Sequence, residues 1–181
     1  KFYSALDWGR TKAYALGLNG IYLNLKDREP HGVLTSGEAE SVKAEIISKI
    51  QDARDPHTGA KILVNAYDAR KVYSGPYLAL APDIVLGYAS DYRISDKSVL
   101  GEFPREIISP REDKWAADHC MDPSVVPGVL FSNREIASSD PAIWDLAPSI
   151  LSCFGLPPAK EMHPRAYAAF LTSLRPMQYK S

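Results

Sequence analysis

The chain has 181 residues, of which 45% are hydrophobic and 24% are charged, and its formal net charge is −1. This size and composition are typical of a globular domain with a real core. The small net charge argues against a nucleic-acid duplex as the main partner, because proteins that bind its phosphate backbone usually carry a basic surface. No apolar run approaches bilayer-spanning length, so no membrane span is expected. The two cysteines, Cys120 and Cys153, are too few for a disulfide framework.

The first predicted elements are two strands joined by a tight turn. Residues 11–16 are predicted to form a strand that enters the interior, and residues 21–25 alternate apolar and polar side chains in strand fashion. Asn19 and Gly20 lie between the two runs, and both residue types accept a positive φ at little cost. The two runs are therefore predicted to form a hairpin or a strand pair.

A helix is predicted to begin at Ser36 or Gly37. Glu38 and Glu40 lie in its first turn, where negative charge meets the positive end of the helix dipole. Apolar residues then recur at helical spacing and make one stripe, which we interpret as core: Val42, Ile46, Ile47, Ile50 and Ala53.

Two further strands are predicted in the middle of the chain, over residues 62–67 and 83–88. Strand, helix and strand alternate, which favours a sheet with helices packed on it. Residues 89–115 follow without clear periodicity. Long irregular segments inside compact domains are often functional loops, so this segment is the expected one to shape a site near its end.

The C-terminal third is predicted to contain a strand and two helices. Residues 129–131 are a short apolar run read as a strand, and Asp145 is expected to cap a helix that ends at Gly155. Residues 167–174 are weakly periodic and are predicted to form a last helix before the tail.

The stretch that can carry chemistry is residues 115–123, which place His119 among acidic residues on a predicted loop. Neutral imidazole is a common ligand for zinc-type metals. A single histidine is more often a surface residue or a hydrogen-bonded structural residue. The residue pattern by itself therefore leaves both roles open.

The run Asp118-His119-Cys120-Met121-Asp122-Pro123, with residues 126–133 after it, resembles the last metal-ligand block of the alkaline phosphatase superfamily. The resemblance is closest to the type I phosphodiesterase/nucleotide pyrophosphatase-like branch. In that family the histidine of a Gly-x-His-Gly or Gly-Asp-His block precedes a strand near the C-terminus and binds one of two metal ions. Residues 7–26 and 72–88 resemble the same branch, so the similarity extends from about residue 7 to about residue 157.

The resemblance implies an α/β fold, namely the C-terminal part of an αβα sandwich with a central mixed, mostly parallel sheet. Residues 1–158 would be the C-terminal portion of an alkaline-phosphatase-like domain, and residues 159–181 a C-terminal helix and tail. His119 is implied as a metal ligand, and Asp118 as a residue that supports it. The implied cofactors are two divalent metal ions, with zinc as the expected metal.

The reaction that the resemblance implies is two-metal hydrolysis of a small phosphate ester or diester. In the family a Thr or Ser attacks phosphorus while the metals hold the attacking and leaving oxygens. The family's nucleophile block and its Ser-Asp-His-Gly block are not in this sequence, so no catalytic residue is assigned. We therefore expect a portion of a longer enzyme that needs the rest of its own chain as partner. Alone it should be inactive and bind no metal tightly, because zinc sites use three or four protein ligands.

Two other functions fit the sequence. The first is a non-catalytic binding module of the same fold, which would suit Ala117 in place of the family's usual glycine and residues 162–164 in place of its acidic-glycine turn. The second is another reaction of the superfamily, phosphate transfer by a mutase or hydrolysis of a sulfate ester. The sequence does not identify the substrate.

Overall fold

The computed structural model describes residues 6–112, 114, 118, 120–133, 136 and 138–162. The chain divides into two compact units, Lys1–Pro127 and Gly128–Ser181. The predicted division near residue 158 stays a prediction, and the helix predicted over residues 167–174 lies outside the described residues. Within the described part of the chain, no helix is both long and apolar enough to cross a membrane.

Four strands of the first unit form one sheet in the order β1-β2-β4-β3. Every neighbouring pair in this sheet is antiparallel. The mixture of helices and strands confirms the α/β class, whereas the expected mostly parallel sheet is not seen among the described strands. The strands are β1 (Ala13–Leu16), β2 (Gly20–Leu23), β3 (Leu63–Asp68) and β4 (Ile84–Tyr88).

The connections explain this antiparallel order. A tight turn joins β1 to β2 and permits antiparallel pairing only. A helical crossover through α2 (Ser36–Gln51) leads from β2 to β3, which run parallel to each other but are separated by β4. The arrangement is a split β-α-β unit with an antiparallel strand inserted at its centre. Among the described residues, parallel pairing is limited to two isolated bridges, Leu25 with Leu34 and Tyr88 with Met121.

The predicted hairpin of β1 and β2 is confirmed. Gly17 has a φ of +79°, a conformation that glycine adopts without strain, and it starts the turn between the strands. Tyr14 lies opposite Tyr22, and their rings stack with centroids 5.6 Å apart. The rings of Trp8 and Tyr14 meet in an edge-to-face arrangement with centroids 5.3 Å apart. These aromatic contacts stabilise the hairpin from the face of the sheet that α2 does not cover.

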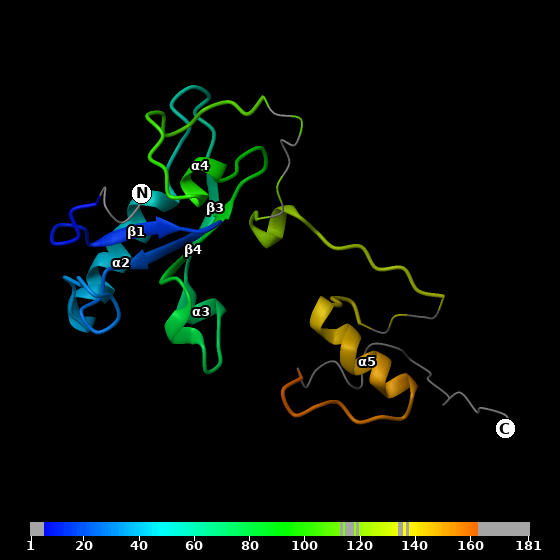
Figure 1. Ribbon diagram of the computed structural model, residues 1–181. Coiled ribbons are helices and arrows are strands. Elements are labelled where there is room, and N and C mark those ends of the chain that lie inside the picture. Colours follow the sequence, from blue (N-terminus) through cyan, green and yellow to red (C-terminus); the bar gives the residue numbers. More distant parts are fainter. Residues whose placement is uncertain are drawn as a thin grey trace. The chain divides into compact units, whose positions relative to one another are not determined.

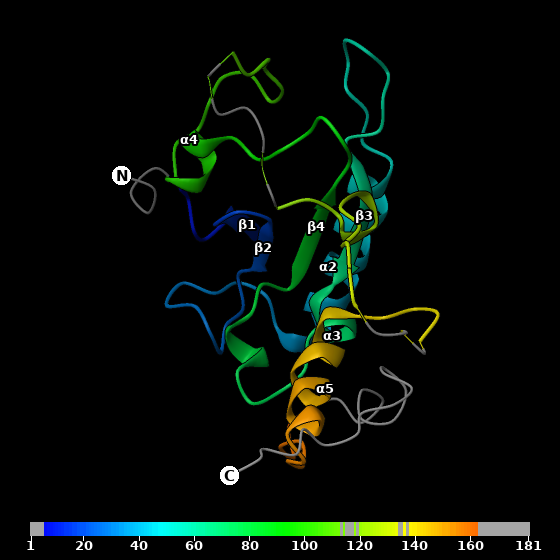
Figure 2. The same cartoon turned by 90° about the vertical axis from the view of Figure 1, so that its right-hand side faces the viewer.

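Helix α2 covers the other face of the sheet (Figures 1 and 2). It begins at Ser36 as predicted, and Thr35 and Glu38 form a reciprocal capping box at its start. The predicted apolar stripe is core, because Ile46, Ile47 and Ile50 pack against the cluster of Leu63, Ile84 and Leu86. A buried ion pair adds to this packing, with Lys43 Nζ 2.9 Å from Asp68 Oδ2 at the end of β3.

Helix α2 also supplies hydrogen-bond partners for backbone groups on the outer edge of β3. The side-chain amide of Gln51 donates to Val64 O at 2.8 Å and accepts from Ala66 N at 2.8 Å. These two bonds take the place of a neighbouring strand at that position.

Short elements complete the unit: α3 (Ala69–Val72), the 3₁₀ turn η1 (Leu78–Leu80), α4 (Asp96–Val99) and the 3₁₀ turn η2 (Pro123–Val125).

The second unit contains the 3₁₀ turn η3 (Ile143–Asp145) and helix α5 (Leu146–Cys153). Gly155, with a φ of +70°, follows the helix as predicted. The strand predicted over residues 129–131 is wrong, because this run has no strand conformation. Val129 and Phe131 are 79% and 91% exposed, so the apolar run is not in the buried setting that a strand of this composition requires.

Candidate functional site

The predicted ligand His119 lies outside the described residues, but both of its neighbours are described. Asp118 and Cys120 contact each other directly, since the Cys120 backbone N–H donates to Asp118 Oδ1 at 3.1 Å. An aspartate carboxylate that accepts from the backbone N–H two residues later forms an Asx turn. The contacts on the two sides of position 119 therefore define the candidate site. We call the contacts of Asp118 the upstream anchor and those of residues 120–122 the downstream anchor.

The upstream anchor is an ion-pair network that holds Asp118. Its Oδ2 lies 3.1 Å from Arg93 Nε, and its side chain is only 8% exposed. The Arg93 guanidinium also lies 2.6 Å from Asp96 Oδ1, and Arg111 Nη1 lies 2.6 Å from Asp96 Oδ2. Three charged residues of the irregular segment after β4 are thus linked to Asp118. The lack of periodicity in residues 89–115 predicted that this segment shapes the site, but it does not indicate which arginines connect the segment to Asp118.

The downstream anchor attaches the chain to the last residue of β4. Met121 forms a parallel bridge with Tyr88, and the Asp122 backbone N–H donates to Tyr88 O at 3.0 Å. The backbone of Leu86, two residues earlier in β4, is bonded to Asn19 just before β2. Because backbone groups of alternate strand residues point to the same side, Met121 lies on the β2 side of β4, beyond the first residue of β2.

The carboxylate of Asp122 is buried at this anchor, with the residue only 1% exposed. Its Oδ1 accepts from Ser124 N at 3.0 Å and from Ser124 Oγ at 2.6 Å, and its Oδ2 accepts from Tyr67 Oη at 2.6 Å. Burial alone would raise the pKa of Asp122, but the bonds from Ser124 and Tyr67 outweigh burial and hold the pKa below its usual value. The carboxylate is therefore ionised at neutral pH.

Gly87 provides the space for this carboxylate. A Cβ placed on Gly87 would overlap Asp122 Oδ2, so the contact requires glycine at this position. A glycine inside a strand is a sequence signal for such close approach, and this signal could have pointed to Asp122. No local sequence pattern indicates a functional role for Tyr67 or Asp122.

Cys120 is a poor candidate for a second ligand. Burial raises the pKa of its thiol, and the charge of Asp118 raises it further. The thiolate is the form that binds metal, so both effects act against coordination by Cys120.

The described residues do not by themselves form a metal site. Among them, no group of three or more His, Cys, Asp or Glu side chains is arranged to hold an ion. Asp118 is engaged by Arg93, and Asp122 by Tyr67 and Ser124. These carboxylates are therefore committed to protein donors.

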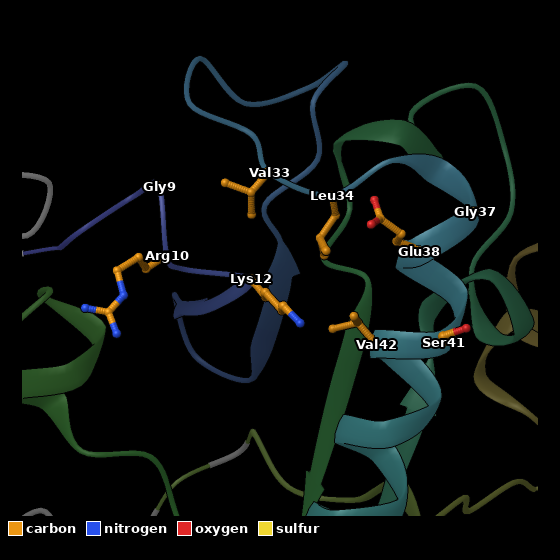
Figure 3. A pocket seen from close by; sticks show the side chains of 9 residues that line it. All are labelled: Gly9, Arg10, Lys12, Val33, Leu34, Gly37, Glu38, Ser41 and Val42. Atoms are coloured by element: carbon orange, nitrogen blue, oxygen red, sulfur yellow. The ribbon is translucent and has the colours of Figure 1, made fainter.

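A separate pocket of about 620 Å³ lies at the start of helix α2 (Figure 3). Lys12 reaches toward Val42 of the helix, whereas Arg10 points away from it. The Thr35–Glu38 capping box already satisfies donors at the helix start. The pocket shares no lining residue with the segment around position 119. Its lining residues are Gly9, Arg10, Lys12, Val33, Leu34, Gly37, Glu38, Ser41 and Val42.

Comparison with known proteins does not assign this site to a family. Neither the protein-family models nor the curated proteins nor the solved structures contain a match to this chain.

Proposed function

We propose that this chain is part of a metal-dependent phosphoric ester hydrolase of the phosphodiesterase/nucleotide pyrophosphatase type and supplies His119 as one metal ligand. One observation carries the proposal: His119 stands in a block, residues 118–123 followed by 126–133, that resembles the last metal-ligand block of the alkaline phosphatase superfamily. The substrate proposed is a small phosphate ester or diester.

The anchors on either side of position 119 support this role. A metal ligand needs neighbours that hold its backbone in place, because misplacement by about 1 Å is enough to spoil a site. Asp118 is held by Arg93, and Asp122 is held by Tyr67 and by the end of β4.

The remaining parts of the enzyme are proposed to lie in polypeptide outside this sequence. These parts are the nucleophile and the other ligands of two divalent ions, expected to be zinc. The chain itself is proposed to be the C-terminal part of an αβα sandwich whose central sheet is mixed and mostly parallel. The described residues do not make a metal cage, so no step of the reaction is assigned to them. Alone, the 181-residue chain is proposed to be inactive.

The test compares this chain with the complete protein encoded by the reading frame that contains it. Both are assayed with zinc on bis(p-nitrophenyl) phosphate, p-nitrophenyl phosphate and p-nitrophenyl sulfate. The proposal predicts turnover of a phosphate substrate by the complete protein and none by the chain alone. Preference for the sulfate would instead assign a sulfatase, and no turnover of any substrate would favour the binding module.

Calorimetry with zinc alone provides an independent check on the 181-residue chain. One histidine is far short of the three or four ligands that a tight zinc site uses. The proposal therefore predicts no tight binding. A sub-micromolar site in this chain alone would contradict the idea that the other ligands come from elsewhere.

A further inference from the structure

One buried contact beside the candidate segment has no part in the proposed chemistry. The Asp122 carboxylate reaches Tyr67 on β3, although the Asp122 backbone is bonded to Tyr88 on β4. The side chain therefore bridges two strands of the sheet. The contact is short, 2.6 Å from oxygen to oxygen, and Asp122 is 1% exposed.

The bridge crosses β4 from one side to the other. Ala89 N donates to Ile62 O, next to β3, whereas Leu86 N donates to Asn19 O, next to β2. Since alternate residues of a strand have the same orientation, the backbone groups of Gly87 point toward β3. Tyr88 has the opposite orientation, which places the Asp122 backbone on the side of β4 away from β3. The carboxylate can reach Tyr67 only by passing over Gly87, where no Cβ stands in the way.

This crossing strongly fixes the position of Asp122 relative to β3 and β4. The carboxylate is ionised and buried, and its hydrogen-bond donors among the described residues are the neutral groups of Tyr67 and Ser124. A buried charge that loses a donor pays a large desolvation penalty. A shift of Asp122 by one residue would break the bond to Tyr67 and also turn the side chain to the other side of the backbone.

We propose that Tyr67 and Asp122 are positioning residues, which hold residues 120–122 at the carboxyl end of β4 and thereby set the placement of His119. This inference rests on the proposed function of His119 as a ligand. Tyr67 acts through Asp122, and Gly87 permits their contact. Neither residue is assigned contact with substrate.

The chain offers a matched control for Tyr67. Tyr92 Oη donates to Asp55 Oδ2 at 2.8 Å, and Asp55 is a buried carboxylate with 7% exposure. The substitutions Tyr67→Phe and Tyr92→Phe therefore each remove one hydrogen bond to a buried carboxylate. Asp55 holds a different turn, because it also accepts from the His57 backbone N–H.

The first readout is amide hydrogen exchange in the 181-residue chain. Tyr67→Phe should speed exchange of the Asp122 amide about tenfold, the change expected for loss of one bond to a charged group, and leave the His57 amide unchanged. Tyr92→Phe should do the reverse. Equal exchange of the Asp122 amide in the two variants would overturn the inference. If Tyr67→Phe does not fold, Asp122→Asn is measured in its place. Faster exchange of the amide at position 122 would then support the inference, and exchange equal to that in Tyr92→Phe would overturn it.

The second readout is the hydrolysis rate of the complete protein. Tyr67→Phe should lower kcat about tenfold at unchanged KM, whereas Tyr92→Phe should leave both at the wild-type values. Unchanged kcat in Tyr67→Phe would show that the contact is structural only and would overturn the positioning role. A wild-type protein without hydrolase activity would instead remove the proposed function, and the exchange result would still decide whether Tyr67 holds residues 120–122.

Discussion

Arg93 and Asp118 form an ion pair, with Arg93 Nε 3.1 Å from Asp118 Oδ2, that joins the irregular segment after β4 to the residue before His119. Both side chains are largely shielded, at 20% and 8% exposure. On the other side of position 119, Asp122 is bonded to the end of β4. Position 119 is thus flanked in the sequence by two anchored carboxylates, those of Asp118 and Asp122.

Replacing Arg93 should therefore cost more stability than replacing an exposed arginine. Arg93→Met removes the cation from a carboxylate with 8% exposure, and we expect a loss of about 2 kcal/mol in the free energy of unfolding. The control is Arg70→Met, because Arg70 is 68% exposed and lies 3.6 Å from Glu40. That variant should lose less than about 0.5 kcal/mol. Urea denaturation measures both, and equal losses would show that the Asp118 anchor is weak.

A methyl group at position 87 should disturb the Asp122 contact. Gly87→Ala places a Cβ against Asp122 Oδ2, and overpacking of this kind costs about 1–3 kcal/mol. Gly37→Ala is the matched control, since a Cβ there meets open space within a helix. It should stabilise the protein by about 0.4–1 kcal/mol. Thermal unfolding compares the two variants, and a neutral Gly87→Ala would contradict the close approach.

The buried ion pair between α2 and β3 should matter far more than an exposed pair on the same helix. Lys43→Met leaves Asp68, 17% exposed, without its cation and should cost about 3 kcal/mol. Lys49 and Glu45 are 75% and 62% exposed, so Lys49→Met should cost less than about 0.5 kcal/mol. Urea midpoints of the two variants test this, and similar values would argue against a buried pair.

The same ion pair predicts a pH dependence. Burial opposes ionisation of Asp68, but the hydrogen bonds from Lys43 and from the Arg70 backbone N–H, together with the charge of Lys43, outweigh it and lower the Asp68 pKa below its usual value of about 3.9. The stability from this group is fully present above that value and is lost as pH falls through the lower, folded-state pKa. The stability difference between wild type and Lys43→Met should therefore shrink in acid. A difference that stays constant from about pH 7 to about pH 2 would contradict this linkage.

Local patterns predicted most elements of the first unit but not how they pair. The hairpin, the apolar stripe of α2 and the short run of β4 each depend on neighbouring residues, and all three are observed. The positive φ of the hairpin turn lies at Gly17, however, and not at Asn19 or Gly20. The direction of the sheet depends on which strands become neighbours over long separations. Nothing near β2 or β3 in the sequence indicates that β4 inserts between them.

The candidate site was predictable only as a sequence block. His119 came from the resemblance, whereas Arg93 and Tyr67 lie 26 and 52 residues before it and became visible only through their contacts with Asp118 and Asp122. The strand expected over residues 129–131 failed for a related reason. An apolar run of that length has no structure of its own without a partner strand, and the sequence does not say whether one is present.

The most direct test replaces His119 by alanine in the complete protein, with His57→Ala as control. His57 is an exposed histidine in the turn after α2, far in sequence from the candidate block. Loss of a metal ligand should lower kcat/KM for phosphodiester hydrolysis and the bound zinc content together, with a rate loss of about 100-fold or more. His57→Ala should match the wild type in both. Full turnover and full zinc content in His119→Ala would contradict the assignment of His119 as a ligand.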